Sequence, residues 1–341
     1  MSASCMKPLL ETLLSGASLT AEQAADGVER IIAGADACQA AAFLVLLKAK
    51  GESPQEVAGM VTAMRRHMVR VHAGVSTIDI VGTGGDGHHT VNVSSGAAVV
   101  MAACGAKVAK HGNRSVSSQC GSADVLEELG VRLDLSAAAV ERCVQQAGIA
   151  FMYAPAFHPA MKSIVPIRKA LGVRTIFNIL GPLLNPAECS RQLIGVYSEP
   201  MVELMANVLH ELRVEHALVV HCGGLDELAP IAVAHVAWVT RDGVTLGSLD
   251  PFALGFRKCS IDDLKGGDRV VNAKILKQVL GGELTGPVAD TIILNAGAAL
   301  FVNGTAASIA EGCDMARGAI ENGAAMRTLH AWVDCCKEAT A

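Results

Sequence analysis

A glycine-rich segment at residues 79–86, with the sequence DIVGTGGD, has the composition of a phosphate-binding turn. Its β-branched start predicts a strand, and its glycines let main-chain N–H groups approach an anion closely. The sequence NVSSG follows at residues 92–96 and opens an apolar helical stretch, whose N-terminus offers further unpaired donors and a favourable dipole. An ordinary tight turn capped by Asp86 is the simpler alternative for this loop alone.

A second polar loop lies one strand later, at residues 110–118, with the sequence KHGNRSVSS. Two cations, an imidazole, an amide and three hydroxyls fall within nine residues. Lysine offers a phosphate a point charge, arginine offers a planar fork, and serine hydroxyls can donate to phosphate oxygens. A solvated loop that caps the helix predicted at residues 122–129 is the alternative. Two such loops in consecutive strand–helix units make that alternative the weaker one.

Two further features could take part in phosphate chemistry. Asp226 and Glu227 are adjacent carboxylates in a glycine-rich loop after a β-branched run, and carboxylate oxygens are ligands that Mg²⁺ prefers. A solvated acidic turn would look the same in sequence. Arg168 is a lone arginine in a helix-like stretch at residues 166–171, where arginine is usually a surface residue or part of a structural ion pair.

The elements that must position these loops change in kind along the chain. From Leu9 to about Val71 the periodicity is helical, with capping boxes at residues 20–23 and 53–56. Short β-branched runs then alternate with helical stretches, and we predict strands at residues 77–81, 106–109, 193–196, 217–221 and 291–295. Such alternation indicates a largely parallel sheet, with ligands outside the carboxyl ends of its strands. The two polar loops and residues 222–227 should therefore converge on one edge.

Composition excludes several classes of protein. The 341 residues can bury a large core, and the longest apolar runs, such as residues 40–47, are far too short to cross a bilayer. A net charge of −5 and an aromatic content of 3% argue against nucleic acid as a partner. The 11 cysteines are an odd number without CxxC spacing, which predicts free, mostly buried thiols. With no signal sequence at the start, we expect a cytoplasmic protein.

Together these motifs resemble those of the anthranilate phosphoribosyltransferase family. The resemblance spans nearly the whole chain and includes GTGGD at 82–86, NVS at 92–94, KHGNR at 110–114, GSADVLE at 121–127, RKALGVRTIFNILGPLLNP at 168–186, GLDE at 224–227 and NAGAAL at 295–300. This chain has Gln119 and Cys120 where a basic residue and serine are common, and Ser95 where threonine is common. Gln119 is therefore left out of the predicted phosphate contacts.

The resemblance implies an α/β fold of the nucleoside phosphorylase and phosphoribosyltransferase type, in which a small all-helical domain joins a larger α/β domain with a mostly parallel central sheet. It places the helical domain at residues 1–72, joined in space by a segment near 160–185, and the α/β domain at residues 73–341. The substrate cleft would lie between the two domains. A homodimer is implied in the same way.

The resemblance also implies site residues. It places 5-phosphoribosyl diphosphate (PRPP) on Gly82, Gly84, Gly85, Asp86, Thr90, Asn92, Ser94, Ser95, Lys110, Asn113, Ser117 and Ser118. It places the acceptor, anthranilate, on Gly82, His111, Asn113, Ala154, His158, Arg168, Gly181 and Pro182. The Arg168 guanidinium would hold the acceptor carboxylate. Mg²⁺ would bind to Ser94, Asp226 and Glu227.

The implied reaction transfers the 5-phosphoribosyl group of PRPP to the amine of anthranilate and releases pyrophosphate, in tryptophan biosynthesis. An aromatic amine is already neutral at cellular pH, so no strong base is needed, and His111, Asn113 and Arg168 would act by positioning. A pyrimidine nucleoside phosphorylase of the same architecture is one rival, and the acidic pair and the complete second loop favour PRPP over it. A non-catalytic relative that binds nucleic acid is the other, and it would predict eroded motifs and a basic surface.

Overall fold

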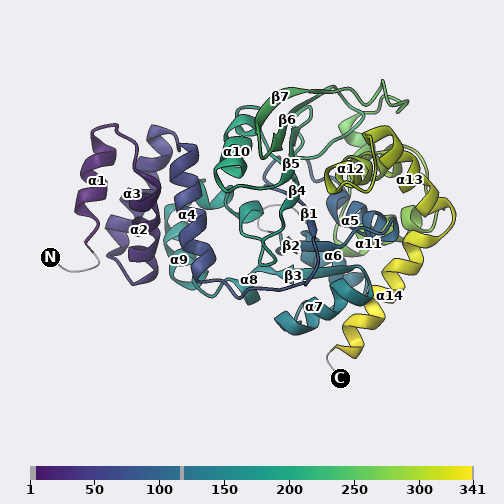
Figure 1. Cartoon of the computed structure of the whole chain (residues 1–341), viewed down its shortest axis with the longest axis horizontal. Helices are drawn as coiled ribbons and strands as arrows, with labels where there is room; N and C mark the ends of the chain where they lie inside the picture. Colours follow the sequence, from purple (N-terminus) through teal and green to yellow (C-terminus); the bar gives the residue numbers. More distant parts are fainter. Residues whose placement is uncertain (1–4, 116–118, 340–341) are drawn as a thin grey trace.

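The computed structural model describes residues 5–115 and 119–339, and within these ranges it contains a single seven-stranded sheet (Figure 1). The strand order is β3-β2-β1-β4-β5-β6-β7. The strands are β1 (Ile78–Gly82), β2 (Val108–Gly112), β3 (Ile149–Tyr153), β4 (Arg191–Gly195), β5 (His216–His221), β6 (Ala234–Thr240) and β7 (Gly243–Leu249). The pairs among β1 to β5 are parallel, and only β6 and β7 run antiparallel to their neighbours. The predicted mostly parallel sheet is therefore confirmed.

Helices surround the sheet and form a bundle at one end of the molecule (Figure 1). The α-helices are α1 (Lys7–Leu14), α2 (Ala21–Ile32), α3 (Ala37–Lys50), α4 (Pro54–Arg66), α5 (Val93–Ala103), α6 (Ser122–Glu128), α7 (Ala137–Gln146), α8 (Ala154–Phe157), α9 (Met161–Leu171), α10 (Pro200–Glu211), α11 (Arg269–Leu280), α12 (Pro287–Asn303), α13 (Ile309–Glu321) and α14 (Ala324–Glu338). Short 3-10 helices are η1 (Ile176–Asn178), η2 (Gly181–Leu183) and η3 (Ile261–Leu264).

The bundle at the N-terminal end follows from local signals in the sequence. Thr20 and Ser53 cap α2 and α4 through reciprocal capping boxes, as predicted. Gly59 lets α2 and α4 pack closely, because a Cβ atom there would lie 2.1 Å from the carbonyl oxygen of Ala21. Helix α9, far along the chain, contacts α2 and α3 and lies beside them in Figure 1. Buried Ile164 of α9 belongs to the same apolar cluster as the bundle.

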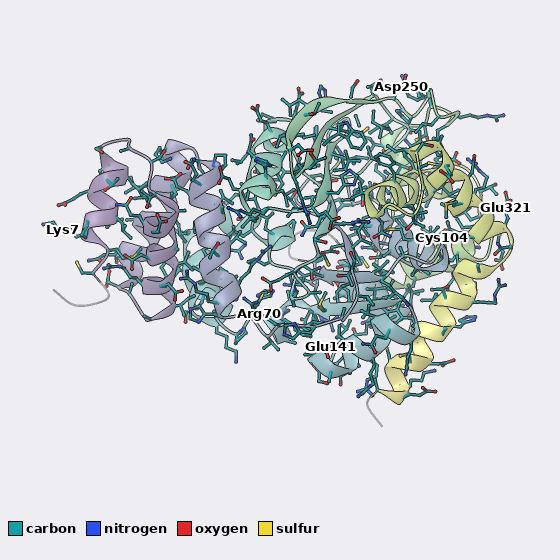
Figure 2. The ribbon with its side chains drawn as sticks, viewed as in Figure 1. Lys7, Arg70, Cys104, Glu141, Asp250 and Glu321 are labelled. Atoms are coloured by element: carbon teal, nitrogen blue, oxygen red, sulfur yellow. The ribbon has the colours of Figure 1, made fainter. Side chains whose placement is uncertain are left out.

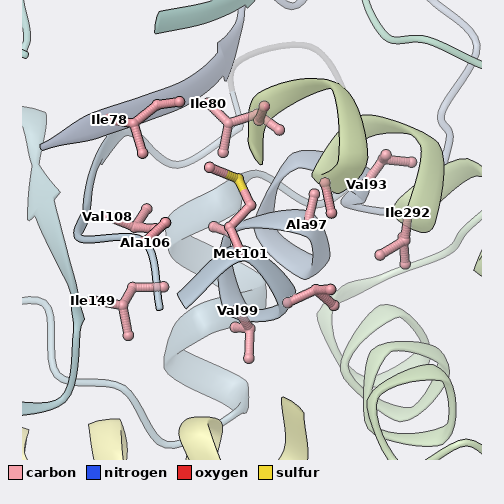
Figure 3. Packing of buried hydrophobic residues seen from close by; sticks show 14 of the residues in the cluster. Ile78, Ile80, Val93, Ala97, Val99, Met101, Ala106, Val108, Ile149 and Ile292 are labelled. Atoms are coloured by element: carbon pink, nitrogen blue, oxygen red, sulfur yellow. The ribbon is translucent and has the colours of Figure 1, made fainter. Parts of the chain in front are cut away.

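The two faces of the sheet bury different parts of the chain, because successive side chains of a strand point to opposite faces. On β4, Leu193 packs into the core shared with α5 and α12, whereas Ile194 packs into the core shared with α10 and the bundle. Figure 3 shows the first core, where Met101 of α5 extends towards Ile80 of β1. Arg70 lies where the helical bundle meets the α/β part of the molecule (Figure 2), and its guanidinium forms an ion pair with Glu188 at 2.9 Å.

One predicted strand is wrong and three strands escaped prediction. Residues 291–295 lie in α12, which begins with Pro287 and is followed by Gly304 in the left-handed region. This helix is buried on nearly all sides, so its β-branched run looks like a core strand and only its length and flanking residues identify it. The strands β3, β6 and β7 were missed, although an Asp-Gly pair at residues 242–243 marks the turn of the β6–β7 hairpin.

The cysteines and helices agree with the expectations from composition. All 11 cysteines are free, and seven of them are buried, as predicted. Among the described residues, no helix combines the length and the apolar character that a membrane span requires.

Candidate active site

The carboxyl ends of the parallel strands meet at one edge, and the loops after β1, β2 and β5 converge there as predicted. Two glycines make this convergence possible. A Cβ atom on Gly82 would lie 2.3 Å from Asp226 Oδ2, and one on Gly195 would lie 1.5 Å from the Asp226 carbonyl oxygen. Any larger residue at the ends of β1 and β4 would therefore displace the acidic loop from the glycine-rich loop.

The glycine-rich loop presents unpaired main-chain donors. The N–H of Thr83 donates to the Gly195 carbonyl and that of Gly84 donates to Asp226 Oδ2 at 2.6 Å. The next three N–H groups, of Gly85, Asp86 and Gly87, have no hydrogen-bond acceptor among the described residues. Gly84, Gly85 and Gly87 all have positive φ, which favours glycine. Successive N–H groups in such a turn form a concave anion site.

Three carboxyl groups gather beside these donors. Asp226 is buried and Glu227 is half-buried in the loop after β5, and Asp86 lies near both. Burial, reinforced by the Asp86 carboxylate, raises the pKa of Asp226 to about 7. Burial and the charge of Asp226 likewise raise the pKa of Glu227 well above its usual value. The raised pKa values mean that Asp226 and Glu227 keep their protons to a higher pH than exposed carboxyls do, and a nearby positive charge would favour their ionised forms.

The chemistry of this donor set fits a hard divalent cation. Among the described residues, no three His, Cys, Asp or Glu side chains are arranged to enclose a metal by themselves. Mg²⁺ does not need such a cage, because it commonly takes one or two carboxylates and fills its other positions with water and phosphate oxygens. Asp226 and Glu227 are suited to that mode. Ser94 is the third predicted ligand, and its hydroxyl lies 3.2 Å from Lys110 Nζ.

Lys110 is fully buried between the predicted metal ligands and the core. Its ammonium donates to the Ile80 carbonyl at 2.6 Å and to Ser94 Oγ. Burial lowers its pKa, and the nearby carboxylates of Asp79 and Glu227 oppose that shift. Burial also raises the pKa of Asp79 to about 6. Lys110 therefore balances the negative charge of Asp79 and Glu227 beside Ser94.

The rest of the second polar loop offers fewer free groups to a phosphate than its composition suggested. The Arg114 guanidinium forms ion pairs with Asp124 at 2.8 Å and Glu127 at 2.9 Å, so it braces α6 instead of offering a free fork to phosphate. Asn113 is exposed, and its side-chain oxygen accepts from the N–H of Arg114. Gln119 is also exposed. The predicted contacts at Ser117 and Ser118 lie outside the described residues.

Of the hydroxyl and amide residues at or just before the start of α5, some bond to other protein groups and one does not. Asn92 is held by protein contacts, since its amide donates to the Cys120 carbonyl and accepts from Asn272 at 2.9 Å. Asn272, from α11, was missed because nothing in its local sequence indicates this contact. Thr90 donates to Glu227 at 3.4 Å, whereas the buried Ser95 hydroxyl has no hydrogen-bond partner among the described residues.

Two histidines predicted to serve the acceptor lie against each other. The rings of His111 and His158 are edge to face, with centroids 5.1 Å apart, and both are buried. Burial lowers the pKa of His111 to about 3 and that of His158 to about 4, so both are neutral at cellular pH. Within the described chain, Nε2 of His111 has no hydrogen-bond partner, and the His158 ring lies near the Leu184 backbone without a well-aligned hydrogen bond. Polar atoms buried without partners indicate a ligand site.

The remaining predicted acceptor residues come from η2, α8 and α9. The backbone of Gly181 lies near His111, which brings the start of η2 close to that ring. Ala154 begins α8, directly after β3. The Arg168 guanidinium lies 5.9 Å from the centre of the Phe177 ring and has no ion-pair or hydrogen-bond partner in the described chain. Burial lowers its pKa.

A separate cavity of about 760 Å³ opens near the acceptor residues. It is lined by Arg114, Glu127, residues 130–134, Tyr153, Pro155 and Ala156. It borders the start of α8, but neither His111 nor His158 is among its walls. The predicted acceptor residues thus do not line this cavity.

Two structural residues near the site were missed. Asn185 donates to Asp79 at 2.7 Å and to the Ala109 carbonyl, which links β1, β2 and the segment after η2. Arg174 donates to the Gly85 carbonyl at 2.7 Å. Asp79 itself carried a signal, since it is a carboxylate inside an apolar strand. The partners of Asp79 and Gly85 are far away in sequence and could not be found from spacing.

The fold and the site define a glycosyl transferase. Residues 7–68 match the helical bundle domain of a glycosyl transferase family, and residues 74–326 match the α/β domain of a glycosyl transferase family. An anthranilate phosphoribosyltransferase of Thermomicrobium roseum is 47% identical over 328 residues, which cover 94% of each chain. One of Chlamydia felis is 43% identical over 96% of each chain. The chain therefore belongs to the anthranilate phosphoribosyltransferase family, whose members are pentosyl-transferring enzymes.

Solved structures agree with this assignment. The anthranilate phosphoribosyltransferase of Thermus thermophilus superposes with a TM-score of 0.91 at 39% identity, covering 99% of this chain and all of that one. The Saccharomyces cerevisiae enzyme, solved in complex with PRPP and Mg, also has a TM-score of 0.91, at 27% identity and 99% coverage of both chains.

Proposed function

We propose that the edge of the sheet described above binds PRPP and anthranilate and transfers the 5-phosphoribosyl group to the anthranilate amine, releasing pyrophosphate. The observation that carries this proposal is the row of three unpaired N–H groups at Gly85, Asp86 and Gly87 beside the carboxyls of Asp226, which is buried, and Glu227, which is half-buried. Main-chain donors suit phosphate oxygens, and adjacent carboxylates suit the cation that accompanies pyrophosphate. The related yeast enzyme, solved with PRPP and Mg, supports this pairing.

In this proposal Mg²⁺, held by Asp226, Glu227 and Ser94, would neutralise charge on the leaving pyrophosphate. The glycine-rich loop orients the phosphate oxygens through its backbone. Lys110 adds a buried positive charge near Ser94 and limits the repulsion among the carboxylates. The partial burial of these groups strengthens each electrostatic contact relative to water.

The acceptor is proposed to bind on the other side of the cleft. His111 and His158 are neutral and offer unpaired ring nitrogens, so they can orient an aromatic amine without taking a proton from it. Arg168 offers a guanidinium that has no partner in the described chain, and a planar fork matches an aryl carboxylate. Gly181 and Pro182 would form an apolar wall, with Asn113 and Ala154 at the margin. Catalysis then rests on positioning the two substrates.

We further propose the wider organisation that the sequence suggested. Residues 1–72 would form one domain together with the segment near 160–185, and residues 73–341 the other. Contacts of α9 with α2 and α3 support this division. The working form would be a cytoplasmic homodimer, which size measurements in solution can test.

A turnover experiment tests the proposed reaction. Protein, PRPP and Mg²⁺ are mixed with anthranilate, whose fluorescence is followed together with pyrophosphate release. We expect equimolar loss of anthranilate and gain of pyrophosphate, and little reaction with aniline, which lacks the carboxylate. Phosphorolysis of a pyrimidine nucleoside with no reaction of PRPP would instead support the phosphorylase alternative. A salt-dependent shift of DNA mobility without turnover would support nucleic-acid binding.

A further inference from the structure

Arg174 connects two parts of the molecule that the proposed reaction uses separately. It lies three residues after the last residue of α9, the helix that carries Arg168. Its guanidinium donates to the Gly85 carbonyl at 2.7 Å and stacks on the Tyr197 ring at 4.8 Å from the ring centre. Tyr197 follows β4, and its N–H donates to the Thr83 hydroxyl at 3.2 Å. Arg174 and Tyr197, which stack on each other, thus both bond to the glycine-rich loop.

The hydrogen bond to Gly85 has a direct consequence for the phosphate-binding donors. The Gly85 carbonyl and the Asp86 N–H belong to one trans peptide unit, in which the two groups point in opposite directions. When Arg174 fixes the carbonyl, it also fixes the direction of an N–H that is unpaired. Glycine at this position has φ of +83° and little intrinsic preference, so an external restraint matters more there than in a rigid turn.

Arg174 is itself well anchored. Gly172 ends α9 in the left-handed conformation. The next residue after Arg174, Thr175, is buried and caps η1, where its N–H donates to Asn178 Oδ1 at 2.9 Å. The guanidinium is planar and delocalised, and it can stack on an aromatic ring while its N–H groups donate at the edge. Of its five N–H donors, one donates to the Gly85 carbonyl, so others remain available to an anion beside the loop.

We infer that Arg174, stacked on Tyr197, is a positioning residue that orders the glycine-rich loop for the pyrophosphate group of PRPP. It does so through the Gly85 carbonyl, and it ties the state of that loop to the end of the helix that carries the acceptor-binding Arg168. This inference rests on the proposed function of the loop.

The test compares Arg174→Ala, Arg174→Lys and Tyr197→Leu with the wild type. Arg174→Ala should raise the KM for PRPP roughly tenfold or more, the effect of losing a hydrogen bond from a charged group. The KM for anthranilate should change less than about twofold. Arg174→Lys keeps the charge but not the planar fork and should recover only part of the loss. Tyr197→Leu should raise the PRPP KM by a few-fold, since it removes only the stacking.

Hydrogen exchange of the loop amides gives a second readout that does not need turnover. In the absence of substrate, the hydrogen-bonded amides of Thr83 and Gly84 should exchange faster in Arg174→Ala than in the wild type, while amides in β4 should be unchanged. Lys162→Ala is the matched control, because Lys162 is an exposed cation on α9 whose side chain has no recorded partner in the described chain. It should behave as the wild type in both measurements.

The outcomes separate this inference from the proposed function. If the wild type does not react with PRPP at all, the proposed function fails. If the wild type turns over and Arg174→Ala shows the same PRPP KM and the same loop exchange, the inference is wrong and the proposed function stands. A rise in the anthranilate KM alone would also overturn the inference, because Arg174 would then serve the acceptor. Circular dichroism and thermal melting of each variant establish that the fold is kept.

Discussion

The proposed phosphate side and the proposed acceptor side of the site are built from different chemical groups. On the phosphate side, consecutive backbone N–H groups of Gly85, Asp86 and Gly87 come from one short loop, next to the adjacent carboxyls of Asp226 and Glu227. On the acceptor side, single side chains come from segments spread along the chain: His111 lies near the end of β2, His158 follows α8, and Arg168 belongs to α9.

This difference determines which substitutions should weaken substrate binding on each side. A backbone site depends on the shape of its loop and on the cation that balances the carboxyls, so single side chains matter mainly when they hold that shape or that charge. A side-chain site loses a specific contact with each substitution. Changes on the two sides should therefore affect different substrates, and the following experiments test that separation.

The largest effect is expected from the acidic pair. Asp226→Asn combined with Glu227→Gln removes the charge that would hold Mg²⁺ while keeping the shape of both side chains. Turnover should fall by roughly a hundredfold or more, and its dependence on Mg²⁺ should weaken. Initial rates across a Mg²⁺ titration provide the measurement. Asp262→Asn with Asp263→Asn is the control, since this second adjacent pair is exposed in η3. Equal rates for the wild type and the Asp226/Glu227 variant would remove the metal assignment.

Arg168 should affect only the acceptor. Losing a hydrogen bond to a charged group costs about 1.5–3 kcal/mol, so Arg168→Ala should lower kcat/KM for anthranilate by roughly ten- to a hundredfold. The preference for anthranilate over aniline should shrink, while the KM for PRPP stays near that of the wild type. Lys169→Ala, an exposed neighbour on α9, should change neither. Weaker PRPP binding with an intact preference would place Arg168 on the phosphate side.

His158 makes a prediction about acid stability. Burial lowers its pKa to about 4, whereas an imidazole in the unfolded chain titrates near 6.5. Above pH 6.5 both states are neutral and the stability is complete. As the pH falls from 6.5 towards 4, the unfolded chain takes up the proton and stability is lost, by about 2 kcal/mol at pH 5.

The variant His158→Gln cannot titrate, so its loss of unfolding free energy between pH 7 and pH 5 should be about 2 kcal/mol smaller than that of the wild type. Urea unfolding at both pH values measures this difference. His72→Gln is the control, because His72 is exposed. The same pH dependence in His158→Gln and the wild type would show that the His158 ring is accessible to protons in the folded state.

The smallest effect is expected from Arg114, although it lies in the loop that looked richest in phosphate ligands. Its ion pairs with Asp124 and Glu127 are partly exposed, and such pairs contribute about 0–1 kcal/mol. Arg114→Gln should lower the unfolding free energy by about that amount and leave the KM for PRPP within roughly twofold of the wild-type value. A tenfold rise in the PRPP KM would show that Arg114 leaves its carboxylates to bind the substrate.

The sequence predicted the glycine-rich turn after β1 because the signals for that turn are local. Glycines at 82, 84 and 85 specify a turn, and the β-branched residues before them specify the strand that ends in it. The convergence of this loop with residues 222–227 followed from the rule that parallel strands share a carboxyl edge. The capping boxes of α2 and α4 were equally local, and they too were confirmed.

The parts that could not be predicted depend on contacts between distant segments. Lys110 and Arg114 look alike in sequence, yet one is buried beside Ser94 and the other pairs with α6. The 291–295 run has strand-like residues, but it lies inside a buried 17-residue helix that only its length and flanking residues distinguish from a strand. The bond from Arg174 to Gly85 joins residues that no spacing rule connects. The roles on the acceptor side came from family resemblance for the same reason.

Separate binding titrations test the division of the site most directly. PRPP with Mg²⁺, and anthranilate, are each titrated by calorimetry into the wild type, Arg168→Ala and the Asp226→Asn/Glu227→Gln variant. We expect a crossed pattern, in which Arg168→Ala binds PRPP as the wild type does but loses anthranilate affinity, and the acidic-pair variant shows the reverse. Loss of the same ligand in both variants would contradict a site with separately built donor and acceptor sides.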